Sequence, residues 1–302
     1  MVRLRRHPNG LCEKVLAAVA LAAFAIAPTA RAFQAAKVSG PLKIVDVLFE
    51  DYEGFPAAHL ELKAGEEAVL NFRVEGFNRL PGKSDSGLPE SSVRLQYEVE
   101  LRDPKGVLVV PAKDGAIQQI LGLQDDQWRP LVRWTAEIPA WAPSGNYPIQ
   151  IRVKDEIGDQ QAEYKVFLQV RGESVPASDT LQAERLEFAR SLDGPWSGQR
   201  YFALDDPVYV RFKIIGFRLA PDHRYIVEQD WTVLDAEGKV VVHKENAVED
   251  QQQHFYPPRF LTTDFRVQLE NPKPGSYTLR VALRDHIGDQ TFSQDAPFHL
   301  RP

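Results

Sequence analysis

Two short acidic segments carry carboxylates at a spacing that could bind a cation. The segments Asp-Glu-Ile-Gly-Asp-Gln (155–160) and Asp-His-Ile-Gly-Asp-Gln (285–290) each place two carboxylates four positions apart beside a glycine. Calcium takes about six to eight oxygen ligands, more than either segment offers. The third acid, Glu156, becomes His286 in the second segment. We therefore expect two structural turns, with calcium binding as the alternative and no metal assigned.

The aspartates and glycines of these turns have separate predicted roles. A strand is expected to end at Asp155 and at Asp285, and in the first segment an alternating strand follows. Each turn is then a hairpin in which Asp155 and Asp285 accept backbone N–H groups. Gly158 and Gly288 are expected to supply positive φ angles there.

The remaining polar residues give no support to catalysis. The histidines have no second histidine at i+2 or i+4, as a paired-histidine metal site would require. Adjacent acids at 66–67, 125–126 and 205–206 fall in expected loops, without the controlled separation that glycoside hydrolysis needs. No Gly-x-Ser-x-Gly motif or glycine-rich phosphate loop is present. We expect no catalytic residues and no cofactor; a hydrolase would need acids or histidines that converge in a cleft.

Four aromatic residues in turn-like sequence are candidate contact residues. They are Trp128, Trp141, Trp196 and Tyr256. Exposed aromatic side chains in loops are typical anchors for protein or sugar ligands. The alternative is that they cover the open ends of a β-sandwich.

The elements that position these residues occur twice along the chain. Residues 145–160 and 275–290 share Gly, Tyr, Asp, Ile, Gly, Asp and Gln in register. Two further motifs recur upstream in the same order: Phe-x-x-x-Gly-Phe (72–77 and 212–217) and Asp-x-x-Gly (103–106 and 235–238). Repeated order predicts a tandem duplication. We expect units at 38–170 and 181–302, joined by a polar linker at 171–180.

Both units are predicted to be all-β. Apolar and polar residues alternate through most segments, as expected for strands that cover a core on one side. Each Asp-x-x-Gly turn should lead, through a left-handed glycine, into a valine-rich strand at 107–110 or 240–242. About seven short strands per unit are typical of an antiparallel β-sandwich.

The two units also differ in predictable ways. Trp134 lies in register with Phe265 on an alternating strand and is expected in the core. Trp231, on the third strand, corresponds to Val99. Between the second and third strands the first unit has an insertion at 81–92, which we expect to be a flexible polar loop.

A tyrosine opens the penultimate strand of each unit. Pro-Ser-Gly-Asn-Tyr leads to Tyr147, and Pro-Gly-Ser-Tyr leads to Tyr277. On these residues each unit resembles a bacterial immunoglobulin-like or fibronectin type III-like domain. The resemblance implies a tyrosine corner, in which the hydroxyl bonds to upstream backbone. It also implies an extracytoplasmic scaffold or binding role without naming a ligand.

The first 32 residues read as a signal peptide. Basic residues precede an apolar run at 15–27, and Ala30-Arg31-Ala32 provides a small-x-small cleavage site. We expect cleavage after Ala32 and no membrane span afterwards; an uncleaved anchor is the alternative. Cys12 and Met1, the only sulfur-containing residues, lie in this segment. The mature chain therefore has no disulfide or thiolate site.

Charge excludes some partners and leaves others open. After cleavage the chain keeps 31 basic and 41 acidic residues, a net charge of −10. Such a chain is not expected to bind nucleic acid. We interpret it as an exported, non-catalytic binding or structural protein, periplasmic or extracellular, with a protein partner. The alternatives are a carbohydrate-binding module and a periplasmic chaperone or inhibitor of immunoglobulin-like fold.

Overall fold

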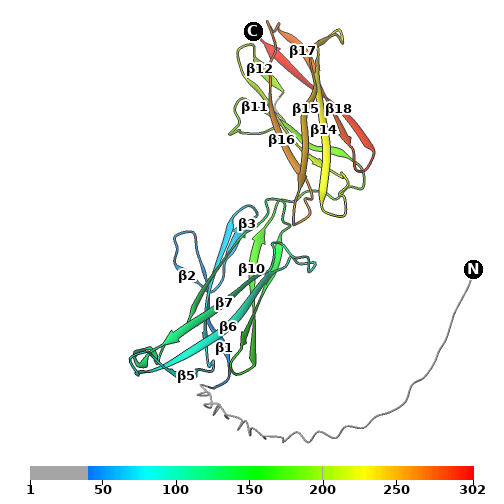
Figure 1. The fold of residues 1–302 in the computed structure, drawn as a ribbon. Helices are drawn as coiled ribbons and strands as arrows, with labels where there is room; N and C mark the ends of the chain where they lie inside the picture. The colour runs from blue at the N-terminus through cyan, green and yellow to red at the C-terminus, as the bar shows by residue number, and fades with distance from the viewer. Residues whose placement is uncertain (1–39, 199) are drawn as a thin grey trace, which may run out of the picture. The chain divides into compact units, whose positions relative to one another are not determined.

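The computed structural model describes residues 40–198 and 200–302. For residues 246–248 it describes the backbone alone. The predicted signal peptide lies outside these residues. The described chain is built from β-strands, and its helical content is the single turn η1 (Leu123–Asp125) (Figure 1). No helix in this part of the chain has the length and apolar character needed to cross a membrane. The predicted all-β fold class is confirmed.

The first half of the chain forms two sheets. Their strands are β1 (Lys43–Glu50), β2 (Pro56–Ala57), β3 (Glu61–Lys63), β4 (Glu67–Glu75), β5 (Leu80–Lys83), β6 (Pro89–Leu101), β7 (Lys113–Leu121), β8 (Leu131–Glu137), β9 (Gly145–Asp155) and β10 (Gln160–Arg171). One sheet has the order β2-β1-β4-β8, and the other β3-β10-β9-β6-β5, with β7 also paired to β6. The pairings are antiparallel except for the short parallel pairing of β3 with β10.

The second half repeats this plan. Its strands are β11 (Gln182–Ala189), β12 (Tyr201–Ala203), β13 (Val208–Ile215), β14 (Arg224–Leu234), β15 (Val240–Gln253), β16 (Leu261–Val267), β17 (Gly275–Asp285) and β18 (Gln290–Arg301). The sheets have the orders β11-β13-β16 and β12-β18-β17-β14-β15. Again one short pairing, β12 with β18, is parallel.

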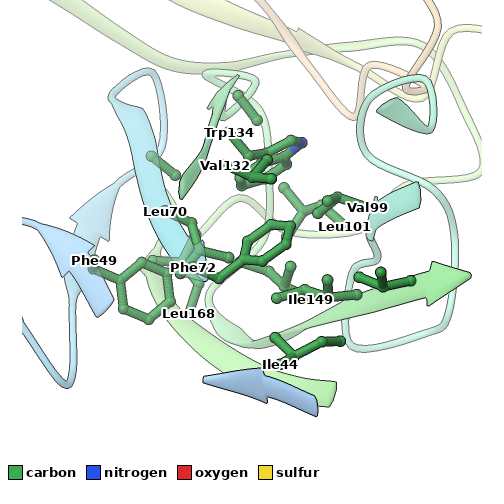
Figure 2. Close-up of a cluster of buried hydrophobic side chains, with 14 of the residues drawn as sticks. Ile44, Phe49, Leu70, Phe72, Val99, Leu101, Val132, Trp134, Ile149 and Leu168 are labelled. Atoms are coloured by element: carbon green, nitrogen blue, oxygen red, sulfur yellow. The ribbon is translucent and has the colours of Figure 1, made fainter. Parts of the chain in front are cut away.

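Alternation along the strands produces the core between the sheets of each pair. In β4, Leu70, Phe72 and Val74 are fully buried, while the residues between them are only partly so. Figure 2 shows Leu70 and Phe72 together with Ile149 and Leu168, which β9 and β10 contribute from the other sheet. Each fully buried side chain of this size contributes roughly 1.5–3 kcal/mol.

The two cores place their largest side chain on different strands. Trp134 of β8 is 2% exposed, which confirms that it is a core residue, and it pairs with Leu70. At the corresponding position of β16 stands Phe265, on which Trp231 of β14 stacks at 5.0 Å. The tryptophan of the core thus lies on the opposite sheet in the second half. This exchange keeps both cores filled.

A buried carboxylate ties the two sheets of each pair together. Asp155, at the end of β9, accepts the backbone N–H of Asn78 at 2.7 Å and its side-chain amide at 2.8 Å. Its other oxygen accepts the N–H of Ile157 at 2.9 Å. Asp285 accepts the N–H groups of Arg218 at 2.7 Å and Ile287 at 3.0 Å in the same way.

The glutamine that ends each acidic segment fastens the segment before the first strand. Gln160 accepts the N–H of Leu42 at 3.0 Å, and Gln290 accepts that of Leu181 at 2.9 Å. The repeated Phe-x-x-x-Gly-Phe motif completes the arrangement. A Cβ on Gly76 would lie 2.0 Å from the carbonyl oxygen of Pro41, so only glycine allows this approach of the two backbones.

The predicted role of Gly158 and Gly288 was wrong. Positive φ angles occur instead at the next residue, 48° at Asp159 and 50° at Asp289. The glycines are required by space, because a Cβ on Gly158 would lie 1.7 Å from the side-chain nitrogen of Asn78. A Cβ on Gly288 would lie 2.4 Å from a carboxylate oxygen of Asp285.

The hydroxyl groups of the repeated tyrosines, Tyr147 and Tyr277, each form a hydrogen bond with the backbone four residues upstream. Tyr147 is fully buried and donates to the carbonyl oxygen of Pro143 at 2.6 Å. Tyr277 is 8% exposed, donates to the carbonyl oxygen of Lys273 at 3.0 Å and accepts its N–H at 3.1 Å. This is the geometry of a tyrosine corner.

Two local predictions need correction. The valine-rich segment 107–110 is not a strand, because only Leu108 forms an isolated bridge and β7 begins later. The insertion at 81–92 is not a loose loop but a hairpin, since β5 pairs with the first residues of β6. The left-handed glycines of the Asp-x-x-Gly turns are as predicted, with φ of 86° at Gly106 and 79° at Gly238.

We predict that Asp155→Asn and Asp285→Asn each destabilise the chain by about 1.5–3 kcal/mol, because a charged acceptor of several N–H groups is lost. Urea denaturation at neutral pH measures this. The matched control is Asp159→Asn in the same turn, where the carboxylate is exposed and asparagine tolerates positive φ. A control loss equal to that of Asp155→Asn would contradict the explanation.

Replacing Tyr147 or Tyr277 with phenylalanine should cost about 0.5–1.5 kcal/mol, since one net hydrogen bond is lost while the ring stays in place. Denaturation midpoints of both variants provide the measurement. Unchanged midpoints in both would show that the hydroxyl bonds do not stabilise the fold.

Candidate interaction site

Two of the four candidate aromatics pack against neighbouring side chains of the chain itself. Trp128 and Trp196 are half-buried. The Trp128 ring packs edge-on against Phe77 at 5.7 Å. The Trp196 ring lies under the guanidinium of Arg211 at 4.0 Å. Neither presents the open flat face that a sugar-binding platform requires.

The other two candidates meet in a buried contact. Tyr256 is 5% exposed, and its hydroxyl donates to a carboxylate oxygen of Asp103 at 2.9 Å. The indole N–H of Trp141 donates to the Tyr256 carbonyl at 3.2 Å. Arg259 donates to the Trp141 carbonyl at 2.7 Å. The loop after β15 therefore packs on the core cluster formed by β1–β10, to which Tyr256 belongs.

Asp103 performs two tasks in this contact. One carboxylate oxygen closes its own turn by accepting the N–H groups of Lys105 at 2.9 Å and Val107 at 2.8 Å. The other oxygen is then available to Tyr256. Burial and the nearby Asp103 charge raise the pKa of both Tyr256 and Tyr147 above the ordinary value for tyrosine. The phenols thus stay neutral donors throughout the physiological range.

The most exposed aromatic side chains lie elsewhere, in the turn between β1 and β2. Tyr52 is 95% exposed and Phe55 is 61% exposed. Asp51 fixes this turn, because one of its carboxylate oxygens accepts the N–H groups of Glu53 at 2.9 Å and Phe55 at 2.8 Å. Gly54 supplies a positive φ of 83°. We call residues 51–55 the aromatic turn.

Sequence reasoning missed the aromatic turn. The available signal was an aromatic pair inside the turn sequence Asp-Tyr-Glu-Gly-Phe. Tryptophans near prolines are more conspicuous, yet the structure places these in contacts within the chain. Aromatic content alone does not distinguish an exposed anchor from the cover of a sheet end.

Acidic side chains surround the aromatic turn. A groove of about 660 Å³ beside Tyr52 is lined by five carboxylates and three cationic side chains: Glu50, Asp51, Glu61, Glu66 and Glu67 against Lys63, Arg133 and Arg171. Arg133 bonds to Glu50 at 2.8 Å and, with Asn71, holds the pKa of Glu50 below its usual value. Arg171 pairs with Glu61 at 2.5 Å. The groove keeps an excess of negative charge.

The histidines and acidic turns do not converge on a metal site in the described part of the chain. No group of three or more histidine, aspartate or glutamate side chains there is arranged to hold an ion. His223, His243 and His286 instead contact Phe255, Thr232 and Glu228, respectively. In the two acidic turns Asp155 and Asp285 accept N–H groups, whereas the exposed Asp159 pairs with Lys154 at 3.3 Å.

Comparisons with known proteins give little further information. No protein-family model and no curated protein matches the sequence. Two solved structures are similar at 9% identity. One is the C-terminal domain of the AgI/II polypeptide BspA of Streptococcus agalactiae, with TM-score 0.27, 86% of this chain and 100% of that chain covered. The other is the C-terminal domain of the antigen I/II-family protein AspA of Streptococcus pyogenes. Its TM-score is 0.26, and the similarity covers 88% of this chain and 100% of that chain. TM-scores this low carry no argument about function.

Tyr256→Phe should destabilise the chain by roughly 1–3 kcal/mol, because a buried Asp103 oxygen loses its donor. The raised pKa of Tyr256 adds a pH dependence. The stabilisation that the neutral Tyr256 gives the folded chain is complete below the ordinary tyrosine pKa of 10.0. It is lost as the pH rises above that value. Urea denaturation between neutral pH and about pH 11 measures both effects.

The matched control is Tyr164→Phe, at a tyrosine that is 42% exposed. This variant should match the unmodified chain at neutral pH. Because the pKa of Tyr147 is raised as well, Tyr256→Phe should keep part of the alkaline loss of stability. A loss as large as that of the unmodified chain would show that Tyr256 does not contribute.

Proposed function

We propose that the chain is an exported, non-catalytic binding protein whose partner is another protein. In this proposal two immunoglobulin-like or fibronectin type III-like domains, at 38–170 and 181–302 with a linker at 171–180, form the scaffold. The aromatic turn is the contact site. The observation that carries the proposal is the exposure of Tyr52 and Phe55 on a turn that Asp51 holds in one conformation.

Strand order supports the proposed domain type. In each copy the third main strand shares a sheet with the last two strands: β6 with β9 and β10, and β14 with β17 and β18. Immunoglobulin-like sandwiches group their third, sixth and seventh strands in this way. The two tyrosine corners support the same assignment. Two clusters of buried residues support the proposed boundaries, because each lies within one half apart from Tyr256, which belongs to the cluster of the first half.

Physical chemistry favours a protein as the ligand. Aromatic side chains on a turn whose backbone is already fixed add little backbone entropy cost on binding and are typical hot-spot anchors. The surrounding carboxylates would attract a partner with a basic rim around an apolar pocket. The same charge would repel an anionic lipid surface. A carbohydrate platform is less well supported, because the four aromatics first considered for it are buried or half-buried.

Site-specific photo-crosslinking in the source organism tests the proposal. A benzophenone amino acid placed at Tyr52 or Phe55 of the exported protein should give one discrete adduct with a protein partner. Adduct formation should weaken in about 0.5 M salt, because salt screens the acidic rim.

Phe167 offers the matched control position, since it is 52% exposed on β10, outside the turn. A crosslinker at Phe167 should not give the same adduct. The absence of any adduct from positions 52 and 55, or an identical adduct from position 167, would refute the aromatic turn as the contact site.

A further inference from the structure

The groove beside the aromatic turn has an apolar floor. Leu60 lies just before β3, Leu62 lies within it, and Val69 lies on β4; all three line the groove together with Tyr52. The three aliphatic side chains are partly buried, and both leucines pack against the core of the first half. The fold therefore holds this floor in place before a ligand arrives.

A larger side chain occupies the position of Val69 in the second half. The repeated Phe-x-x-x-Gly-Phe motif aligns Val69 with Tyr209, and each lies between two buried residues that face the core. Strand pairing gives the same alignment, because both residues stand on the middle strand of the orders β1-β4-β8 and β11-β13-β16. The smaller residue leaves room on the outer face of the first half.

Two of the three cationic side chains in the groove are already paired. Arg133 pairs with Glu50 at 2.8 Å, and Arg171 pairs with Glu61 at 2.5 Å. The other charged residues of the lining, which form no ion pair within the described part of the chain, are Asp51, Glu66, Glu67 and Lys63. Three carboxylates thus remain against one ammonium group.

The three carboxylates keep oxygens that can accept further hydrogen bonds. Asp51 uses one oxygen for the two N–H groups of its turn. Glu66 uses one oxygen for the N–H of Lys63 at 2.8 Å. Glu67 is exposed at the start of β4. A cationic group that enters the groove therefore meets charged acceptors, which form the stronger kind of hydrogen bond.

We propose that the groove receives an arginine side chain of the protein partner. The inference rests on the proposed function and adds the residue that the partner contributes. The methylene groups of the arginine cover the floor of Leu60, Leu62 and Val69, as the stems of basic side chains commonly cover apolar surface. Its guanidinium reaches the carboxylates and stacks on the ring of Tyr52. Arginine fits better than lysine, because the planar guanidinium pairs with carboxylates through two bonds and stacks on aromatic rings.

A capped tripeptide tests the proposal. The probe is acetyl-Gly-Arg-Gly-amide, titrated into the predicted mature chain, residues 33–302, with backbone amide NMR shifts as the readout. The shifts of Leu62 and Val69 should saturate with roughly millimolar affinity. The matched probe carries citrulline, which has the shape of arginine without its charge. It should bind about fivefold more weakly or worse, because its pairs with the carboxylates lose their charge.

Variants of the chain locate the bound arginine. Val69→Tyr should abolish the shifts, because it places on the floor the side chain that the second half carries at this position. Glu67→Gln should weaken binding about two- to threefold, because one exposed carboxylate is lost. Asp114→Asn is the control, since it removes the same charge from an exposed residue of β7 outside the groove. It should bind like the unmodified chain. Glu67→Gln decides the result if thermal melting shows that Val69→Tyr is unfolded.

Three outcomes would overturn the proposal: no saturation by about 10 mM peptide, equal binding of the arginine and citrulline peptides, or equal effects of Glu67→Gln and Asp114→Asn. Any of these results together with an intact photo-crosslink from Tyr52 refutes the arginine alone and leaves the proposed function standing. Arginine binding without that crosslink would instead refute the proposed function, and with it the assignment of the arginine to this partner.

Discussion

A carboxylate buried between two sheets is the interaction on which the rest of each copy depends. Burial of a charged group is costly unless its oxygens accept hydrogen bonds. Asp155 meets this requirement with N–H groups from Asn78 and Ile157, and Asp285 does so with those of Arg218 and Ile287. Because one donor follows the second main strand and the acceptor ends the penultimate strand, the bond links the two sheets of each pair. The nearby glycines follow from this contact, since a side chain on either would collide with the bonded groups.

The two halves of the chain share this arrangement and differ in what surrounds it. Both copies keep the aspartate, the glutamine that fastens the first strand and the tyrosine corner. The large core ring moved from β8 in one copy to β14 in the other. The loop that carries Trp128 in the first copy carries Tyr256 in the second, where it packs on Asp103. The two halves thus share the residues that satisfy these buried polar groups and differ at loops and open sides.

The contrast between shared buried contacts and differing loops indicates where binding is expected. A sandwich with its buried groups satisfied needs nothing more from its loops than connection, so these can acquire other roles. The aromatic turn is a place where large apolar side chains stay in contact with water. The second half has a turn at the same place, where Gly194 donates to the carbonyl of Ser191 as Gly54 does to that of Asp51, but it lacks the two exposed aromatic rings. Surfaces of this kind become favourable only when a partner covers them.

The sequence by itself determined most of the strands, the motifs that recur in both halves, the left-handed glycines of the Asp-x-x-Gly turns and the core position of Trp134. These depend on alternation, local turn chemistry and repetition, which are properties of neighbouring residues. Only the tertiary structure decided that Gly158 serves close approach rather than positive φ, because its neighbour Asn78 is distant in sequence. The same reason applies to the aromatic residues. Tyr256 is buried because a segment distant in sequence packs on it, and Tyr52 is exposed because no such segment does. Val109 is likewise buried while Val241, at the same distance from its turn glycine, is exposed, because the pairing of β15 with β14 leaves Val241 at a bulge that no local pattern contains.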